Sequence, residues 1–160
     1  MPDMLTLSDH LPEVALAPGD VLVREGNPNG PVWVLVSGEL TVSKAGTEVN
    51  TISLPGAVIG EMSVLLGLGH GATVVAATPA RLRVAEDGAA LLASDPAVVR
   101  LVAEGLARRL NFVTTYLADL KEQYGDAPGL SMVSDVLSTL SHHERAPARP
   151  GSARDPDPDY

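Results

Sequence analysis

The sequence predicts a mainly β domain, a sandwich or a barrel with flanking helices, followed by one long C-terminal helix. Short β-rich runs bounded by glycine and proline fill the stretch between residues 21 and 84. Many short strands at close, regular spacing are typical of sandwiches and barrels. Beyond that stretch, apolar residues recur at alternating steps of four and three from Val99 to Tyr124. This is the period of a long helix with one apolar face.

Composition limits the classes of protein and of partner. A chain of 160 residues has room for one domain with a core, plus a tail. The net charge of −9 repels phosphate backbones, so we expect no nucleic acid partner. Cysteine is absent, which excludes disulfides and thiolate chemistry. The first residues do not resemble a signal peptide, and no run approaches the ~20 apolar residues of a membrane span. We therefore expect a cytoplasmic protein without a membrane partner.

The elements follow one another in a simple order. Residues 1–13 are predicted to form a short lead-in helix. Turns such as P-G-D at 18–20 and S-G-E at 37–39 then separate successive strands. The predicted strands cover residues 21–24, 32–36, 40–44, 49–53, 73–77 and 81–84. A short helix is expected at 86–93, before the S-D-P start of the long helix at 94–96.

The stretch from Gly60 to Ala77 contains the parts of an anion-binding loop. A glycine and a carboxylate, Glu61, precede a short apolar helix predicted at 62–66, and a glycine-rich loop then leads into the strand at Thr73. A helix that begins just after a glycine directs free backbone N–H groups, and the positive end of its dipole, at whatever lies in front of it. Phosphate is the ligand that this arrangement favours.

The same stretch resembles the phosphate-binding cassette of the cyclic nucleotide-binding domain family. That family shows F-G-E-L-A-L and P-R-A-A-T where this chain has I-G-E-M-S-V at 59–64 and G-H-G-A-T at 69–73. Three further landmarks fall in order: P-G-x-x-L-x-x-E-G at 18–26, S-G-x-x-x-V at 37–42 and L-x-G-x-x-x-G-E at 54–61. The resemblance covers about residues 11–120 and implies a double-stranded β-helix jelly-roll barrel followed by a lid helix.

The resemblance also implies a set of nucleotide-binding residues. Glu61 stands where the family binds the ribose 2′-hydroxyl, and His70 stands where an arginine pairs the cyclic phosphate. Arginine presents a charged, planar fork, whereas histidine is mostly neutral at pH 7, so binding of cyclic AMP or a related nucleotide should be weakened. The predicted site comprises Gly60, Glu61, Met62, Ser63, His70, Gly71, Ala72 and Thr73.

Two interpretations of His70 stay open. The imidazole beside a bound phosphate would have a raised pKa and would act as a conditional cation, so that binding strengthens as the pH falls toward about 6. Alternatively, His70 is a surface loop residue in a pocket that has lost its ligand. The flanking Gly69 and Gly71 add an entropic cost to ordering the loop in either case.

The helix predicted at 96–124 carries an apolar stripe that is sustained for more than three heptads. Packing against the chain's own barrel is one explanation, and a parallel homodimer, as the resemblance to bacterial regulators implies, is the one we favour. The predicted dimer seam is Val99, Ala103, Leu106, Leu110, Val113, Leu117 and Leu120. The resemblance further implies a purine contact from Thr114 or Thr115, while both threonines could instead lie on an exposed face.

After Gly125 the resemblance ends. A short amphipathic helix is expected within 126–141, from Ser131 to Leu140, and residues 142–160 are rich in proline and charge and are predicted to be disordered. No winged helix-turn-helix fits in this stretch, which disfavours a transcription factor. The expected domain is thus residues 1–125, including the lid helix.

Other chemistry finds little support in the sequence. The histidines lack the H-x-H spacing of a cupin metal site, and no nucleophile elbow or Walker loop occurs, so we expect no metal, no cofactor and no catalytic residue. The favoured hypothesis is a stand-alone, non-enzymatic sensor or adaptor with cyclic AMP as a regulatory ligand. The alternative is a degenerate domain that binds no nucleotide and serves as a scaffold for dimerisation and for an unknown protein partner.

Overall fold

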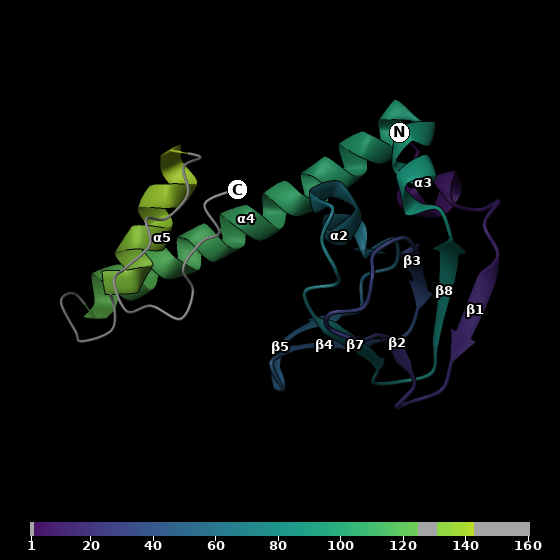
Figure 1. The fold of residues 1–160 in the computed structure, drawn as a ribbon, viewed down its shortest axis with the longest axis horizontal. Helices are drawn as coiled ribbons and strands as arrows, with labels where there is room; N and C mark the ends of the chain where they lie inside the picture. The colour runs from purple at the N-terminus through teal and green to yellow at the C-terminus, as the bar shows by residue number, and fades with distance from the viewer. Residues whose placement is uncertain (1, 125–130, 143–160) are drawn as a thin grey trace. The chain divides into compact units, whose positions relative to one another are not determined.

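A computed structural model describes residues 2–124 and 131–142 of the chain, with side chains up to residue 140. Strands dominate its first part and helices its second (Figure 1). The strands are β1 (Glu13–Leu16), β2 (Val21–Val23), β3 (Val32–Ser37), β4 (Leu40–Lys44), β5 (Thr47–Ile52), β6 (Val58–Ile59), β7 (Thr73–Ala76) and β8 (Ala80–Ala85). The helices are α1 (Met4–Leu7), α2 (Glu61–Leu66), α3 (Gly88–Ser94), α4 (Pro96–Tyr124) and α5 (Ser131–His142).

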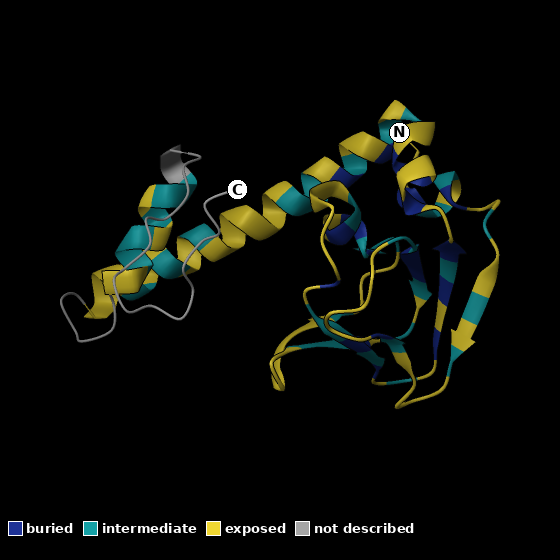
Figure 2. Ribbon diagram, viewed as in Figure 1, coloured by how far each residue is buried: buried dark blue, intermediate teal, exposed yellow. Residues whose placement is uncertain are grey.

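The strands form two antiparallel four-stranded sheets, in the orders β1-β8-β3-β6 and β2-β7-β4-β5. Figure 1 shows β1, β8 and β3 side by side, apart from the group of β5, β4, β7 and β2. Both sheets contribute to one apolar core, and Figure 2 shows dark blue positions on β3 and β8. Leu35, Leu40 and Leu82 are fully buried in that core. The fold prediction, a β-roll barrel with flanking helices and a long C-terminal helix, is confirmed.

Two strands of the structure, β1 and β6, are not among the predicted ones. β6 has only two residues and pairs with β3 in the register Trp33↔Ile59. β1 starts at Glu13, the last residue of the stretch predicted to form a lead-in helix, and within that stretch the structure has only the four-residue helix α1. Arg81 of β8 donates hydrogen bonds of 2.7 and 3.2 Å to the Glu13 carboxylate, which lowers the pKa of Glu13 and fastens β1 to its neighbour.

The chain divides into two compact units, residues 1–105 and 106–160, and the boundary falls within α4. In the first unit, Val98 and Val102 of α4 are buried one helical turn apart. The second unit contains the remainder of α4 and the whole of α5. The start of α5 at Ser131 agrees with the expected amphipathic helix. The expected domain boundary at residue 125 stays a prediction, and the predicted disordered tail lies outside the described residues apart from the end of α5.

Candidate nucleotide-binding site

Gly60 immediately precedes the cassette helix α2, and only glycine fits at this turn. Gly60 has a φ of 93°, in the left-handed region that strains other residues. A Cβ at this position would lie 2.8 Å from the carbonyl oxygen of Pro31 and 3.3 Å from the ring of Trp33. The β6 pairing places Gly60 directly against β3, so the chain must turn into α2 here. The position of the first N–H groups of α2, which have no acceptor within the helix, is therefore fixed.

The loop between α2 and β7 is held by the turn that follows β2. The His70 N–H donates to the Asn27 carbonyl at 2.8 Å, and the Gly26 N–H donates to the His70 carbonyl at 2.7 Å. The Asn29 side chain donates to the carbonyl of Leu68 at 2.7 Å. Each hydrogen bond joins residues far apart in the sequence, so the glycine-rich loop is ordered by its neighbour despite its composition.

His70 faces the interior of the first unit, and only 6% of it is exposed. Its Nδ1 lies 3.3 Å from the Ser63 hydroxyl of α2, and its ring centroid lies 5.9 Å from that of Trp33, with the planes tilted by 44°. Burial lowers the pKa of His70, because desolvation disfavours the imidazolium. The interpretation of His70 as a surface loop residue is therefore wrong. Glycine at 60, whose added Cβ would meet His70 Cε1 at 3.4 Å, is what leaves room for the ring.

The remaining cassette residues gather on α2 and on the start of β7. Glu61 and Ser63 are buried in the first turn of α2, whereas Met62 is half exposed. Gly71 is exposed, and Ala72 and Thr73 are partly buried. The Thr73 hydroxyl accepts a hydrogen bond of 2.9 Å from the N–H of Glu25, which fixes the end of the loop. The structure brings these residues into one region, and their binding of a nucleotide stays a prediction.

Sequence reasoning missed two residues of this region. Trp33 packs against both Gly60 and His70, but its place in a buried strand made it look like any core residue. Lys44, at the end of β4, comes close to Gly71. No motif joins positions 44 and 71, because only the pairing of β4 with β7 brings them together. A lone lysine before a turn carries no sequence signal of its own.

The residues predicted on α4 lie in a regular helix. The Thr114 hydroxyl donates to the Leu110 carbonyl at 2.7 Å, a local bond within the helix, and Thr115 is exposed. In the seam, Val99, Leu110 and Val113 are each nearly half exposed, at 49%, 48% and 46%. At about 3.6 residues per turn, Leu106, Val113 and Leu120 of the seam lie on the same side of the helix as the buried Val102. The purine contact and the dimer seam stay predictions.

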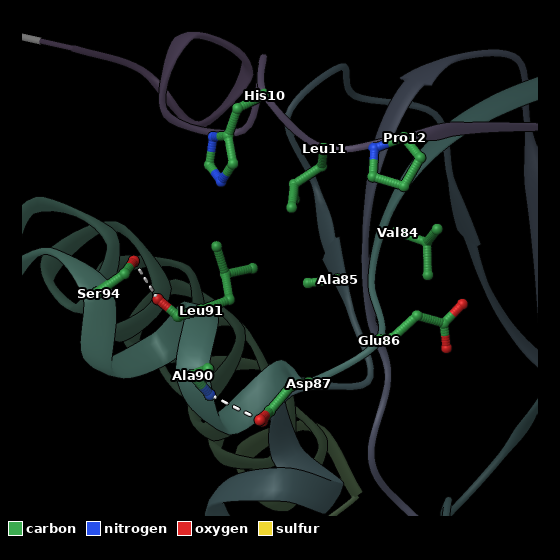
Figure 3. Close-up of a pocket in the computed structure, with 10 residues that line it drawn as sticks. All are labelled: His10, Leu11, Pro12, Val84, Ala85, Glu86, Asp87, Ala90, Leu91 and Ser94. Atoms are coloured by element: carbon green, nitrogen blue, oxygen red, sulfur yellow. Dashed lines mark hydrogen bonds between the residues drawn. The ribbon is translucent and has the colours of Figure 1, made fainter.

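A hollow of about 400 Å³ in the first unit has none of the predicted nucleotide-binding residues in its lining (Figure 3). It lies between the residues that precede β1 and those that join β8 to α3. Two of its polar side chains serve α3: the Asp87 carboxylate caps the Ala90 N–H at 3.0 Å, and the Ser94 hydroxyl donates to the Leu91 carbonyl. His10 and Glu86 also line the hollow.

The described residues offer neither a metal site nor a membrane span. Within residues 2–124 and 131–142, no three histidine or acidic side chains gather as metal ligands would. The helices of the same residues include none that combines the length and the apolar character needed to cross a bilayer.

The two sheets, the glycine-started α2 and the long α4 place the chain in the class of β-roll domains with flanking helices. The chain belongs to the cyclic nucleotide-binding domain family, whose sequence profile matches residues 13–105, more than half of the 160 residues. The match ends where the first compact unit ends. The resemblance recognised in the sequence is thereby confirmed.

Comparison with individual proteins agrees with this assignment. The chain is 29% identical to the N-terminal domain of a transcriptional regulator from Streptomyces coelicolor A3(2), with a TM-score of 0.50 over 67% of this chain and 81% of that one. It shares its fold with the catabolite activator protein of Thermus thermophilus, at 21% identity and a TM-score of 0.60 over 86% of this chain and 81% of that one. It is 38% identical over 76 residues to the acetyltransferase Pat of Mycolicibacterium smegmatis, which is 46% of this chain and only 23% of the acetyltransferase.

Proposed function

We propose that this chain is a cytoplasmic, non-enzymatic sensor or adaptor module that binds cyclic AMP or a related nucleotide weakly. The observation that carries the proposal is the assembled cassette: Gly60 turning the chain into α2, and a loop ordered by residues 26–29 ahead of β7. Family membership gives this cassette its ligand class. The ligand would lie between the first turn of α2 and the loop end at Gly71, Ala72 and Thr73, with Glu61 receiving the ribose.

Binding is proposed to be weak because position 70 lacks an arginine. A charge-assisted hydrogen bond contributes roughly 1.5–3 kcal/mol, so its loss lowers affinity about ten- to a hundred-fold. The imidazole of His70 is a poor substitute at neutral pH, since burial keeps it uncharged. To reach a phosphate, its ring would also have to give up its contacts with Trp33 and Ser63.

The module is further proposed to act as a homodimer through α4. A sustained seam with nearly half-exposed valine and leucine side chains is costly in water, and pairing with a second copy would bury it. Purine contact by Thr114 or Thr115 belongs to the same proposal, with α4 as the lid. The Thr114 hydroxyl keeps a free acceptor while it donates to Leu110.

The partial similarity to an acetyltransferase does not assign catalysis to this chain. The chain spans less than a quarter of the length of that enzyme, and no candidate catalytic residue was identified in its sequence. We therefore propose that any output comes from a protein partner or from a further segment, and that the β-roll itself performs no chemistry.

Calorimetric titration with cyclic AMP and cyclic GMP, at about pH 7.5 and about pH 6, tests the proposal. We expect weak saturable binding by the wild type, and binding about ten-fold tighter or more for His70→Arg. Tighter binding at the lower pH would mean that a protonated His70 leaves its pocket to meet the phosphate. If the folded wild type gives no saturable binding at millimolar ligand, the nucleotide-binding function of this chain is refuted, whether or not His70→Arg binds.

One observation favours the alternative function, a scaffold that binds no nucleotide. The ring of His70 packs beside Gly60 and against the ring of Trp33, as the side chain of a core residue would. Under that hypothesis α4 and α5 are the working surfaces. The same titration decides between the two, because a scaffold gives no heat with either nucleotide.

A further inference from the structure

We propose that Lys44, a residue outside the cassette, supplies the positive charge that pairs with the phosphate of the ligand. The inference rests on the proposed function, because it concerns the same site. Position 70 provides no cation at neutral pH, since its ring is buried and turned toward Trp33. A chain of net charge −9 needs a local positive group to hold an anion.

The pairing of strands brings Lys44 to the cassette loop. β4 pairs with β7 in the register Ser43↔Thr73, so the next residue of β4 stands level with the loop that precedes β7. The Lys44 amine nitrogen lies 3.8 Å from the point that a Cβ on Gly71 would occupy. The amine therefore lies beside Gly71, next to the backbone proposed to hold the phosphate.

Glu25 holds both the end of the cassette loop and the turn that follows Lys44. Its N–H donates to the Thr73 hydroxyl at 2.9 Å, which fixes the end of the cassette loop. Its carboxylate accepts a hydrogen bond of 2.9 Å from the N–H of Ala45, which follows Lys44 in the turn to β5. Ala45 has a φ of 50°, a left-handed conformation that this hydrogen bond helps to hold. The end of β4 and the loop are thus linked through one residue.

The amine of Lys44 is available to a ligand. Lys44 is exposed, and within the described residues no ion pair or side-chain hydrogen bond involves it. The Glu25 carboxylate accepts the hydrogen bond of the neighbouring Ala45 N–H. Glycine at position 71 leaves the space between amine and loop open. A lysine is a compact charge with three donors, so it can pair with a phosphate oxygen without the fixed geometry of an arginine fork.

Lysine in this place predicts weak, salt-sensitive binding. The amine reaches the site from an exposed strand end, so ions of the solution screen it strongly. Arginine on the loop itself would hold the phosphate two oxygens at a time. Lys44 thus explains how the cassette can retain a cyclic nucleotide without an arginine and why the affinity should be low.

The test compares Lys44→Gln with Lys121→Gln, an exposed lysine of α4 that serves as the matched control. Cyclic AMP and adenosine, which lacks the phosphate, are titrated at about pH 7.5, in about 0.02 M and about 0.3 M salt. For cyclic AMP we expect Lys44→Gln to weaken binding about ten-fold and to remove most of its salt dependence. Adenosine should bind both variants and the wild type equally, and Lys121→Gln should behave as wild type.

A chemical readout separates contact from indirect effects. Lysine acetylation by an amine-reactive reagent, followed by mass spectrometry, should show Lys44 protected by cyclic AMP but not by adenosine, with Lys121 as the internal reference. Wild-type binding that Lys44→Gln leaves unchanged, with no protection of Lys44, overturns this inference and leaves the proposed function standing. A wild type that binds no cyclic AMP overturns both.

Discussion

The interior of the β-roll and the seam of α4 are two apolar surfaces that differ in how they are covered. Leu35 and Leu82 are fully buried between the two sheets, within a cluster that both sheets build. Leu110 and Val113 have the same chemical character, yet nearly half of each is exposed. The roll therefore buries its own hydrophobic residues, whereas the predicted seam leaves these two side chains nearly half exposed. Apolar periodicity indicates that a face will be buried, and it does not say by which chain.

The largest effect is expected from opening the interior of the roll. Leu35→Ala removes a buried side chain from a core that cannot fully collapse, which should lower the free energy of unfolding by about 2–5 kcal/mol. Urea denaturation followed by the fluorescence of Trp33 measures this change. Leu54→Ala is the matched control, since 73% of Leu54 is exposed, and it should change stability by less than about 0.5 kcal/mol. Equal losses for the two variants would contradict the division between interior and surface.

A smaller effect on stability is expected from protonating His70, which is buried against Trp33 of the same core. Burial lowers the pKa of His70 from its ordinary value of 6.5, so the unfolded chain takes up this proton at a higher pH than the folded one. The free energy of unfolding should therefore fall as the pH drops below 6.5 and continue to fall until the lowered pKa is passed. Glutamine keeps a hydrogen-bonding partner for Ser63 without titrating.

Thermal melts between about pH 7.5 and about pH 5 test this linkage. Other groups also titrate in this range, so the informative quantity is the difference between wild type and His70→Gln. The exposed His10 gives the matched control variant, His10→Gln. A wild type and a His70→Gln variant with the same pH dependence would show that His70 is not held in its neutral form.

Substitution in the seam is expected to change the stability of the β-roll least and its oligomeric state most. Leu110→Glu places a charge on the exposed stripe, so light scattering should show a monomer while the wild type has the mass of a dimer. The β-roll should keep its stability within about 0.5 kcal/mol, because Leu110 lies outside its core. Asn111→Glu, an exposed position away from the stripe, should leave the dimer intact. An unchanged mass for Leu110→Glu refutes the seam.

The sequence by itself determined the landmarks of this protein. Gly60 and Glu61 identified the cassette, because turns and helix starts depend on local chemistry that a few adjacent residues carry. The boundaries of α4 followed from the S-D-P start and from a period sustained to Tyr124. The long predicted strands were found for the same reason, whereas β6 had too few residues to show any period.

Only the tertiary structure decided how His70 is oriented and which residue outside the cassette lies next to its loop. Periodicity cannot tell into which side of a loop His70 turns, and the answer depends on a space that Gly60 and Trp33 leave open. Lys44 meets Gly71 through the pairing of β4 with β7, a contact between residues that no local pattern connects. Such contacts depend on the closing of the barrel, because the free energy of each residue there is set by neighbours distant in the chain.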